Sequence, residues 1–316
     1  MLRSAILAAS RNARIESLVT HAPVSRGVVH RFVGGADTDA AILTAGALIR
    51  DGLTVTLDHL GEDTTDTAHA DAVVEAYLEL LGALDRQGLT ERSRPLTARA
   101  EVSVKLSAIG QALPGDGEKI ALDNARRICA EAHSVGATVT LDMEDHTTTD
   151  STLQILDDLR RDFPETAAVL QAYLRRTLGD CRELSGAGSR VRLCKGAYRE
   201  PPSVAFGRRE EVDLSYVRCM NVLLAGEGYP MFATHDPRLI AIGVERARFH
   251  GKGLDEHEFQ MLYGIRPDEQ RRLAGNGHTV RIYIPYGAQW YGYLMRRLAE
   301  RPANLTFFGR ALFSKG

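Results

Sequence analysis

The sequence predicts an α/β fold in which eight parallel strands close into a (β/α)8 barrel. Two observations support this fold class. Short runs rich in Val, Ile, Leu, Thr and aromatic residues alternate with longer amphipathic runs, which is the pattern of parallel strands joined by crossover helices. We count eight short runs, the number that closes such a barrel. A doubly wound open sheet would give the same alternation and stays open as an alternative.

In chain order, we expect an N-terminal helical segment over residues 1–50 that packs on a catalytic barrel over residues 51–316, in one domain overall. The expected strands cover residues 54–61, 101–109, 137–144, 167–174, 190–197, 231–236, 258–264 and 279–287. Most are bounded by Gly, Pro or Asp, which end strands. Helical periodicity is clearest over residues 118–136, 150–163 and 236–253.

The composition of the 316 residues is that of an ordinary globular protein, with 44% hydrophobic residues and a net charge of −2. The near-neutral charge argues against a nucleic-acid partner. The cysteines lie far apart without a C-x-x-C pair, which argues against a zinc ribbon and fits a reducing compartment. The apolar run at residues 5–9 is short for a signal peptide, and the longest run, residues 40–49, is half of the roughly 20 residues of a membrane span.

In a (β/α)8 barrel, catalytic side chains lie at the C-terminal ends of the strands. The expected strand ends share polar or charged groups: Glu62, Lys105, Asp142, Glu144, Gln171, Arg192, Lys195, Thr234, His235, Tyr263 and Tyr283. A single such residue is more often a member of a structural ion pair. Because all eight expected strands end in this way, we expect an active site at this rim.

The segment YLMRRLAE near the C-terminus has the spacing of an amphipathic helix. Tyr293, Arg296, Arg297 and Glu300 fall on one face, opposite an apolar face. The usual structure for such a pattern is a solvated surface helix with an Arg296–Glu300 pair. The alternative is a carboxylate-binding face, in which two guanidiniums hold an anion and Glu300 positions one of them.

Several common signatures are missing from the chain. No strand is followed by G-x-G-x-x-G, and neither a G-x-x-x-x-G-K-[ST] loop nor a G-x-S-x-G elbow is present. The sequence therefore does not support a Rossmann dinucleotide site, a P-loop nucleotide site or an α/β-hydrolase elbow.

The motif LDMEDH raises a metal site as a second hypothesis. Asp142, Glu144 and His146, with His235 and Asp236 further along, are ligand types that suit a divalent cation. The signal is weak, because alternate strand residues point to opposite sides and acidic residues often cap helices. A metal-dependent lyase or hydrolase using these residues is the alternative enzyme.

The motif RLCKGAYREP is more distinctive. Arg192 ends a strand, and Lys195, Gly196 and Ala197 form a tight turn whose amides a ligand can approach closely. Two cations beside such a turn suit an anionic or electron-rich cofactor. A plain turn with solvated basic residues fits the pattern equally well.

Taken in order, several blocks resemble the monofunctional bacterial proline dehydrogenases. The blocks are SVKLSAIG, LDMEDH, LQAYLRR, RLCKGAYREP, FATHD, MLYGIRPDEQRRL and IYIPYGAQWYGYLMRRLAERPAN, and the likeness runs from about residue 30 to the end. The resemblance implies a distorted barrel that holds FAD noncovalently, with the last helix over the barrel mouth. It also implies oxidation of L-proline to Δ1-pyrroline-5-carboxylate, with electrons passed to a quinone.

By this resemblance, Arg296 and Arg297 grip the proline carboxylate, Lys105 is a third cation there, and Glu300 pairs with Arg296. The side chains implied to wall the pyrrolidine ring are Tyr198, Leu262, Tyr283 and Tyr293. Asp142 carries over as an active-site carboxylate placed to bond Tyr293 or Arg297.

For the cofactor, Arg192 is implied as the cation beside the flavin ring. The other implied FAD contacts are Met143, Gln171, Lys195, Gly196, Ala197, Thr234 and His235. One departure from the pattern is that the interval between Tyr283 and Tyr293 is shorter than in the bifunctional proline-utilisation enzymes, which concerns how the site closes over its substrate.

The implied reaction moves a hydride from the ring carbon next to nitrogen to the flavin N5, so the amine reacts in its neutral form. No general base stands out among the residues, and a high pH optimum is expected if solvent removes the proton. A binding protein that captures a carboxylate ligand on the arginine face is a non-enzymatic alternative. The resemblance places the chain in the cytoplasm, with peripheral contact with the cell membrane by analogy only, and raises a downstream pyrroline-5-carboxylate dehydrogenase as a partner.

Overall fold

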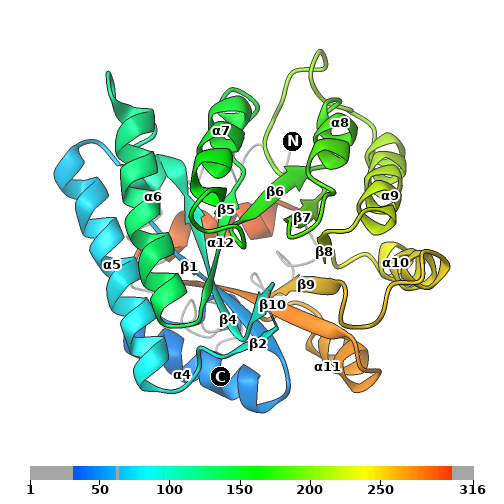
Figure 1. The fold of residues 1–316 in the computed structure, drawn as a ribbon, viewed down its shortest axis with the longest axis horizontal. Helices are drawn as coiled ribbons and strands as arrows, with labels where there is room; N and C mark the ends of the chain where they lie inside the picture. Colours follow the sequence, from blue (N-terminus) through cyan, green and yellow to red (C-terminus); the bar gives the residue numbers. More distant parts are fainter. Residues whose placement is uncertain (1–30, 62–63, 95, 301–316) are drawn as a thin grey trace, which may run out of the picture.

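The structure, a computed structural model, describes residues 31–61, 64–94 and 96–300, with only the backbone at residues 93–94 and 296–300. Eight parallel strands close into a barrel in the order β1-β10-β9-β8-β7-β6-β5-β4 (Figure 1). The strands are β1 Thr54–His59, β4 Ala100–Lys105, β5 Thr138–Asp142, β6 Ala167–Gln171, β7 Arg190–Cys194, β8 Tyr229–Ala233, β9 Glu258–Leu262 and β10 Thr279–Tyr286. Each lies inside a predicted range or overlaps it.

Barrel closure excludes the doubly wound alternative. The first strand, β1, pairs in parallel with both β4 and the last strand, β10, so the sheet of the barrel has no open edge. The strands end earlier than predicted. The largest difference follows β4, where residues 106–109 form a 3-10 helix, η1 Leu106–Ile109.

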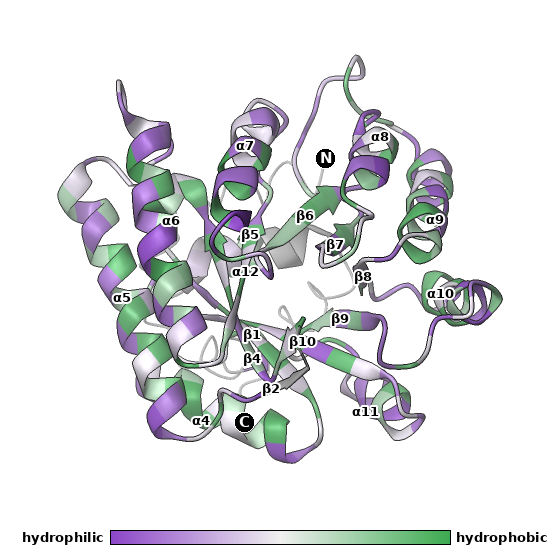
Figure 2. Cartoon of the chain, viewed as in Figure 1, coloured by the Kyte–Doolittle hydropathy of each residue, from purple (hydrophilic) through white to green (hydrophobic). Residues whose placement is uncertain are grey.

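Helices surround the barrel (Figure 1), and the predicted helices at residues 118–136, 150–163 and 236–253 are confirmed. Their bounds are α4 Thr38–Arg50, α5 Thr67–Arg86, α6 Gly117–Ser134, α7 Thr149–Arg160, α8 Thr177–Glu183, α9 Arg209–Ala225, α10 Pro237–Phe249, α11 Pro267–Gly275 and α12 Trp290–Glu300. Figure 2 shows hydrophobic and hydrophilic stretches alternating along α5 and α6, as expected for helices with one buried face. Apolar residues of these helices and the outward-facing strand residues form one core.

The last helix, α12, follows β10 and crosses the C-terminal end of the barrel. Its Tyr293 packs with Val33 and with Leu60, the residue that follows β1. This position agrees with the expected placement of the last helix over the mouth.

A short antiparallel hairpin at the other end of the barrel was not predicted. It consists of β2 Arg92–Arg94 and β3 Thr97–Ala98, two strands too short to show a periodic pattern. Leu96 in its turn packs against a cluster of Ala167, Tyr229 and Met231. This hairpin therefore covers the N-terminal end of the barrel and leaves the C-terminal end for a site.

The barrel interior carries charged groups among the described residues. Four acidic side chains (Asp58, Glu101, Asp142 and Glu258) lie with four basic ones (Lys105, Arg190, Arg192 and Arg281), and their formal charges sum to zero (4 − 4). Unpaired charges inside a protein are costly, so this balance is what allows the interior to be polar.

Candidate functional site at the C-terminal end of the barrel

Three donors converge on the carboxylate of Asp142 at the end of β5. Ser103 Oγ donates to Oδ1 over 2.7 Å and Arg192 Nη1 donates to the same oxygen over 2.8 Å. Tyr283 OH donates to Oδ2 over 2.7 Å. The three donors come from β4, β7 and β10, so barrel closure assembles this cluster from strands far apart in sequence. The prediction that Asp142, Arg192 and Tyr283 lie at one rim is confirmed.

Tyr283 is a neutral hydrogen-bond donor in this cluster. Burial, followed by the negative charges of Asp142 and Asp58, raises the pKa of its phenol well above the usual value. The guanidinium carbon of Arg192 lies 5.4 Å from the centre of the Tyr283 ring, a cation–π distance. The ring is therefore held from one side by the guanidinium and at its hydroxyl by the carboxylate.

Lys105 at the end of β4 is held by a residue that the sequence analysis did not identify. Its ammonium contacts both carboxylate oxygens of Asp58 on β1, over 2.8 and 2.9 Å. Asp58 is 2% exposed, and burial raises the pKa of its carboxyl although Lys105 opposes the shift. Glu62, the predicted polar end of the first strand, lies outside the described residues. The strand β1 ends at His59, and Asp58 faces the barrel interior.

Below this rim, Glu101 joins two guanidiniums. Arg192 Nη2 lies 2.9 Å from Glu101 Oε1, and Arg190 Nη2 pairs with Oε2. Burial alone would raise the pKa of Glu101, but Arg190, Arg281 and Arg192 outweigh it and hold this pKa well below its usual range. Glu101 is therefore an anion at zero exposure, and it was not identified from the sequence.

The turn after β7 approaches the ring of Tyr173 closely. Gly196 has φ +102°, and a Cβ there would lie 2.3 Å from this ring, so glycine is required on both counts. Lys195 pairs with Asp213 and Asp236. Ala197 follows Gly196 in the loop after β7.

Other predicted cofactor contacts lie at the ends of β5, β6 and β8. Gln171 Nε2 donates to the carbonyls of Met143 and Glu144, over 3.2 and 3.1 Å. His235 Nε2 accepts from the backbone N–H of Leu262 over 2.8 Å, so this ring carries its proton on Nδ1. Thr234 is buried.

The residues of the metal hypothesis are not brought together as ligands. The backbone N–H and ring of His146 contact Glu200, which also accepts from Tyr173 OH over 3.1 Å. Glu144 accepts from the hydroxyl and backbone N–H of Ser107. In the part of the chain that the structure describes, no group of three His, Cys, Asp or Glu side chains could hold a metal ion. Glu200 instead connects the loops after β5, β6 and β7.

The arginine face on α12 lies outside the described side chains. This concerns Arg296, Arg297 and Glu300, whose helical backbone is described. Of the other expected substrate contacts, Tyr293 is 7% exposed and Tyr198 is 42% exposed.

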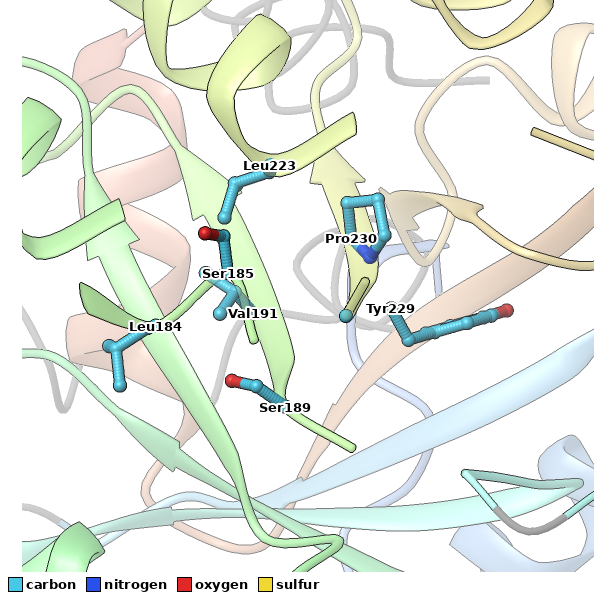
Figure 3. A pocket seen from close by; sticks show the side chains of 8 residues that line it. Leu184, Ser185, Ser189, Val191, Leu223, Tyr229 and Pro230 are labelled. Atoms are coloured by element: carbon cyan, nitrogen blue, oxygen red, sulfur yellow. The ribbon is translucent and has the colours of Figure 1, made fainter. Parts of the chain in front are cut away.

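A small pocket lies at the opposite end of the barrel (Figure 3). It is lined by Ser189 and Val191 of the β7 region, Tyr229 and Pro230 at the start of β8, and Leu223 of α9. These positions are the N-terminal ends of the strands, away from Asp142. Its lining contains no charged group, so we do not assign the site to it.

No helix among the described residues is long and apolar enough to cross a membrane.

Comparisons with known proteins agree with this geometry. The sequence profile of the family described as proline dehydrogenase matches residues 41–310. The chain is 39% identical to the proline dehydrogenase of Deinococcus radiodurans, covering 97% of this chain and 96% of the relative. It is 35% identical to proline dehydrogenase 1 of Bacillus subtilis, covering 100% of both. A crystal structure of proline utilization A from Bdellovibrio bacteriovorus, inactivated by N-propargylglycine, superposes with a TM-score of 0.80 at 27% identity; it covers 92% of this chain, which spans 34% of that longer protein.

Proposed function

This chain belongs to the proline dehydrogenase family, and we propose that it oxidises L-proline to Δ1-pyrroline-5-carboxylate with a noncovalently bound FAD. The observation that carries the proposal is the cluster of Asp142, Arg192, Tyr283 and Lys105 at the C-terminal end of a closed barrel. This is the end at which barrels of this type place their chemistry.

The residues at the rim fit a flavin. Among the described residues, Gln171 Oε1 and Arg192 Nε are buried atoms without a hydrogen-bond partner. The polar edge of an isoalloxazine ring presents both hydrogen-bond donors and acceptors. Such an edge can therefore use Gln171 Oε1 as an acceptor and Arg192 Nε as a donor. We assign Arg192, Gln171, Met143, the turn Lys195–Ala197, Thr234 and His235 to holding the cofactor. When bound, the flavin takes the hydride from the ring carbon next to nitrogen.

Proline is an amino acid with a carboxylate, a secondary amine and an apolar ring. Lys105 can reach the carboxylate because its side chain is 12% exposed at the rim. We assign Arg296 and Arg297 to the same carboxylate, because their helix crosses this end of the barrel and guanidiniums bind carboxylates bidentately. We assign three side chains to the wall around the pyrrolidine ring: Leu262, Tyr283 and Tyr293. Tyr198 is assigned to the outer part of the same wall, and Glu300 to a pair with Arg296.

Among the described rim residues, no side chain stands out as a base for the substrate amine. Both carboxylate oxygens of Asp142 accept hydrogen bonds from the protein, Oδ1 from Ser103 and Arg192 and Oδ2 from Tyr283, so the carboxylate is engaged by these donors and not turned towards the substrate amine. We therefore assign no general base, and kcat/KM is expected to rise with pH until the amine of free proline is deprotonated. A kcat/KM that is flat below neutral pH would contradict this assignment.

The proposal is tested by an anaerobic absorbance spectrum of the purified protein before and after L-proline is added. A yellow protein that bleaches with L-proline and keeps its colour with D-proline supports flavin, substrate and reaction together. A yellow protein indifferent to L-proline would move the substrate to another cyclic amine. A protein that stays colourless after FAD is added would refute the proposal.

The electron acceptor and the partners are part of the same proposal. A soluble quinone added after bleaching should restore the flavin absorbance, because the reduced cofactor must pass on its electrons. The product is a cyclic imine with a carboxylate, which a pyrroline-5-carboxylate dehydrogenase would consume. A cytoplasmic chain with peripheral membrane contact at the quinone is consistent with this scheme, and flotation with vesicles tests that contact.

A further inference from the structure

Four charged side chains form a continuous column through the barrel interior, in the order Arg190, Glu101, Arg192 and Asp142. We call this set the charge column. Arg190 Nη2 lies 2.5 Å from Glu101 Oε2, Arg192 Nη2 lies 2.9 Å from Glu101 Oε1, and Arg192 Nη1 lies 2.8 Å from Asp142 Oδ1. The signs alternate along the column, and only its Asp142 end reaches the rim.

The two lower members of the column are inaccessible to any ligand. Arg190 and Glu101 are both at zero exposure, at the start of β7 and in β4. The Glu101 carboxylate also accepts from Thr56 Oγ1 over 2.8 Å, and Arg190 Nη1 donates to the carbonyl of Glu165 over 3.1 Å. Direct contact with proline or a cofactor therefore does not explain why two charges are buried here.

Arg192 transmits the effect of these charges to the rim. Its guanidinium is shared between Glu101 below and Asp142 above, so Glu101 both fixes its position and offsets its charge. In the barrel interior, where the effective dielectric constant is far below that of water, a unit charge is felt over several ångströms. Reduction of a flavin adds negative charge to its ring, so the local positive charge changes the equilibrium between oxidised and reduced cofactor.

We propose that Glu101 and Arg190 are positioning residues that set the reduction potential of the bound flavin through Arg192. This inference rests on the proposed function, because it requires a flavin beside Arg192. Glu101 lowers the potential by offsetting the Arg192 charge, and Arg190 raises it by offsetting Glu101.

The test is a redox titration of the FAD-loaded protein against a reference dye in wild type, three variants of the pair and one control variant. Glu101→Gln should raise the potential, Arg190→Gln should lower it, and the double variant should lie near the wild-type value. Thr56→Val is the matched control, because it removes an uncharged hydrogen bond to the same carboxylate and should leave the potential unchanged. A merely structural role of the pair would not give shifts of opposite sign.

The outcomes separate the inference from the function on which it rests. If both single variants bind flavin and their potentials shift in the same direction, or do not shift, the inference is overturned and the proposed function stands. A wild-type protein that binds no flavin overturns both. If Glu101→Gln fails to fold, Arg190→Gln decides alone: a lower potential supports the inference, and an unchanged or higher one overturns it.

Discussion

The lower and upper halves of the barrel interior both contain buried ion pairs, but they use them differently. In the lower half, the side chains of Glu258 and Arg281 are 0% and 1% exposed, and Arg281 also donates to the carbonyls of Val55 and Ala98. In the upper half, the side chains of Lys105 and Asp142 are 12% and 15% exposed. Lower pairs are bound to backbone on several sides and join strands, whereas a ligand can reach the upper pairs.

Burial of charge alone therefore does not mark a catalytic site. A buried pair adds little net stability, yet removal of one partner is costly because the other charge is left unpaired. Whether the removal of one partner reduces stability or turnover depends on where along the strand the ion pair lies. We expect changes at the Glu258–Arg281 pair to reduce stability and changes at the rim to reduce turnover.

The largest expected effect is loss of stability in Arg281→Met. Glu258 would be left as a buried charge without its cation, which costs on the order of 3–5 kcal/mol in the free energy of unfolding. Urea unfolding of the FAD-loaded protein measures this loss. A change below about 1 kcal/mol would contradict a stabilising role for the lower pairs.

Lys105→Met should lower kcat/KM for L-proline about 100-fold, which corresponds to about 2.7 kcal/mol. The variant removes the ammonium from the rim and leaves Asp58 without its partner. Steady-state kinetics with a soluble quinone measure the effect. Lys119→Met, at an exposed position of α6, is the matched control and should behave like wild type.

Acid should destabilise the lower half through His257, which is 1% exposed just before β9. Burial, followed by the charge of His278, lowers the pKa of His257 to about 4. At pH values between about 4 and about 6.5, the unfolded chain binds a proton at this histidine that the folded protein does not bind. The contribution of His257 to the free energy of unfolding is therefore fully present above pH 6.5 and is lost as the pH falls towards 4. We expect a loss on the order of 2 kcal/mol in wild type, and a smaller one in His257→Gln, from urea unfolding at both ends of this window.

The smallest expected effect is that of Tyr283→Phe, which removes one donor from Asp142. A hydrogen bond to a charged group is worth about 1.5 kcal/mol, so the rate of flavin reduction should fall about tenfold. Tyr286→Phe is a control on the same strand, because Tyr286 faces the helices in the apolar core. Equal rates in the two variants would remove Tyr283 from the proposed machinery.

Much of the fold was predictable because the outward face of the strands packs on the helices, which gives each strand Val, Leu, Ile or aromatic residues, and in strands such as β4 these alternate with polar residues of the interior. The ends of the strands were less predictable. Apolar residues such as Met143 and Ala172 continue beyond β5 and β6 into buried loops, so composition does not show where pairing stops.

The rim residues Lys105, Asp142, Arg192 and Tyr283 were predictable because each lies at or near the end of its strand. Their partners were harder to find. Asp58 is paired with Ser103 in the register of β1 and β4, close to Lys105 two residues further along β4, and this register cannot be read from the sequence. The alternation of Glu101, Ser103 and Lys105 along β4 was the available signal for an inward polar face.

The most direct test of the difference between the Glu258–Arg281 pair and the rim is a comparison of Arg281→Met with Lys105→Met. The measurement is the rate of flavin reduction by L-proline, in rapid-mixing experiments under anaerobic conditions at one pH. We expect Arg281→Met, although destabilised, to reduce its flavin within about twofold of the wild-type rate, and Lys105→Met to be slowed about 100-fold at subsaturating proline. If the two variants were slowed equally, the Glu258–Arg281 pair would belong to the catalytic machinery, and its assignment to stability alone would be wrong.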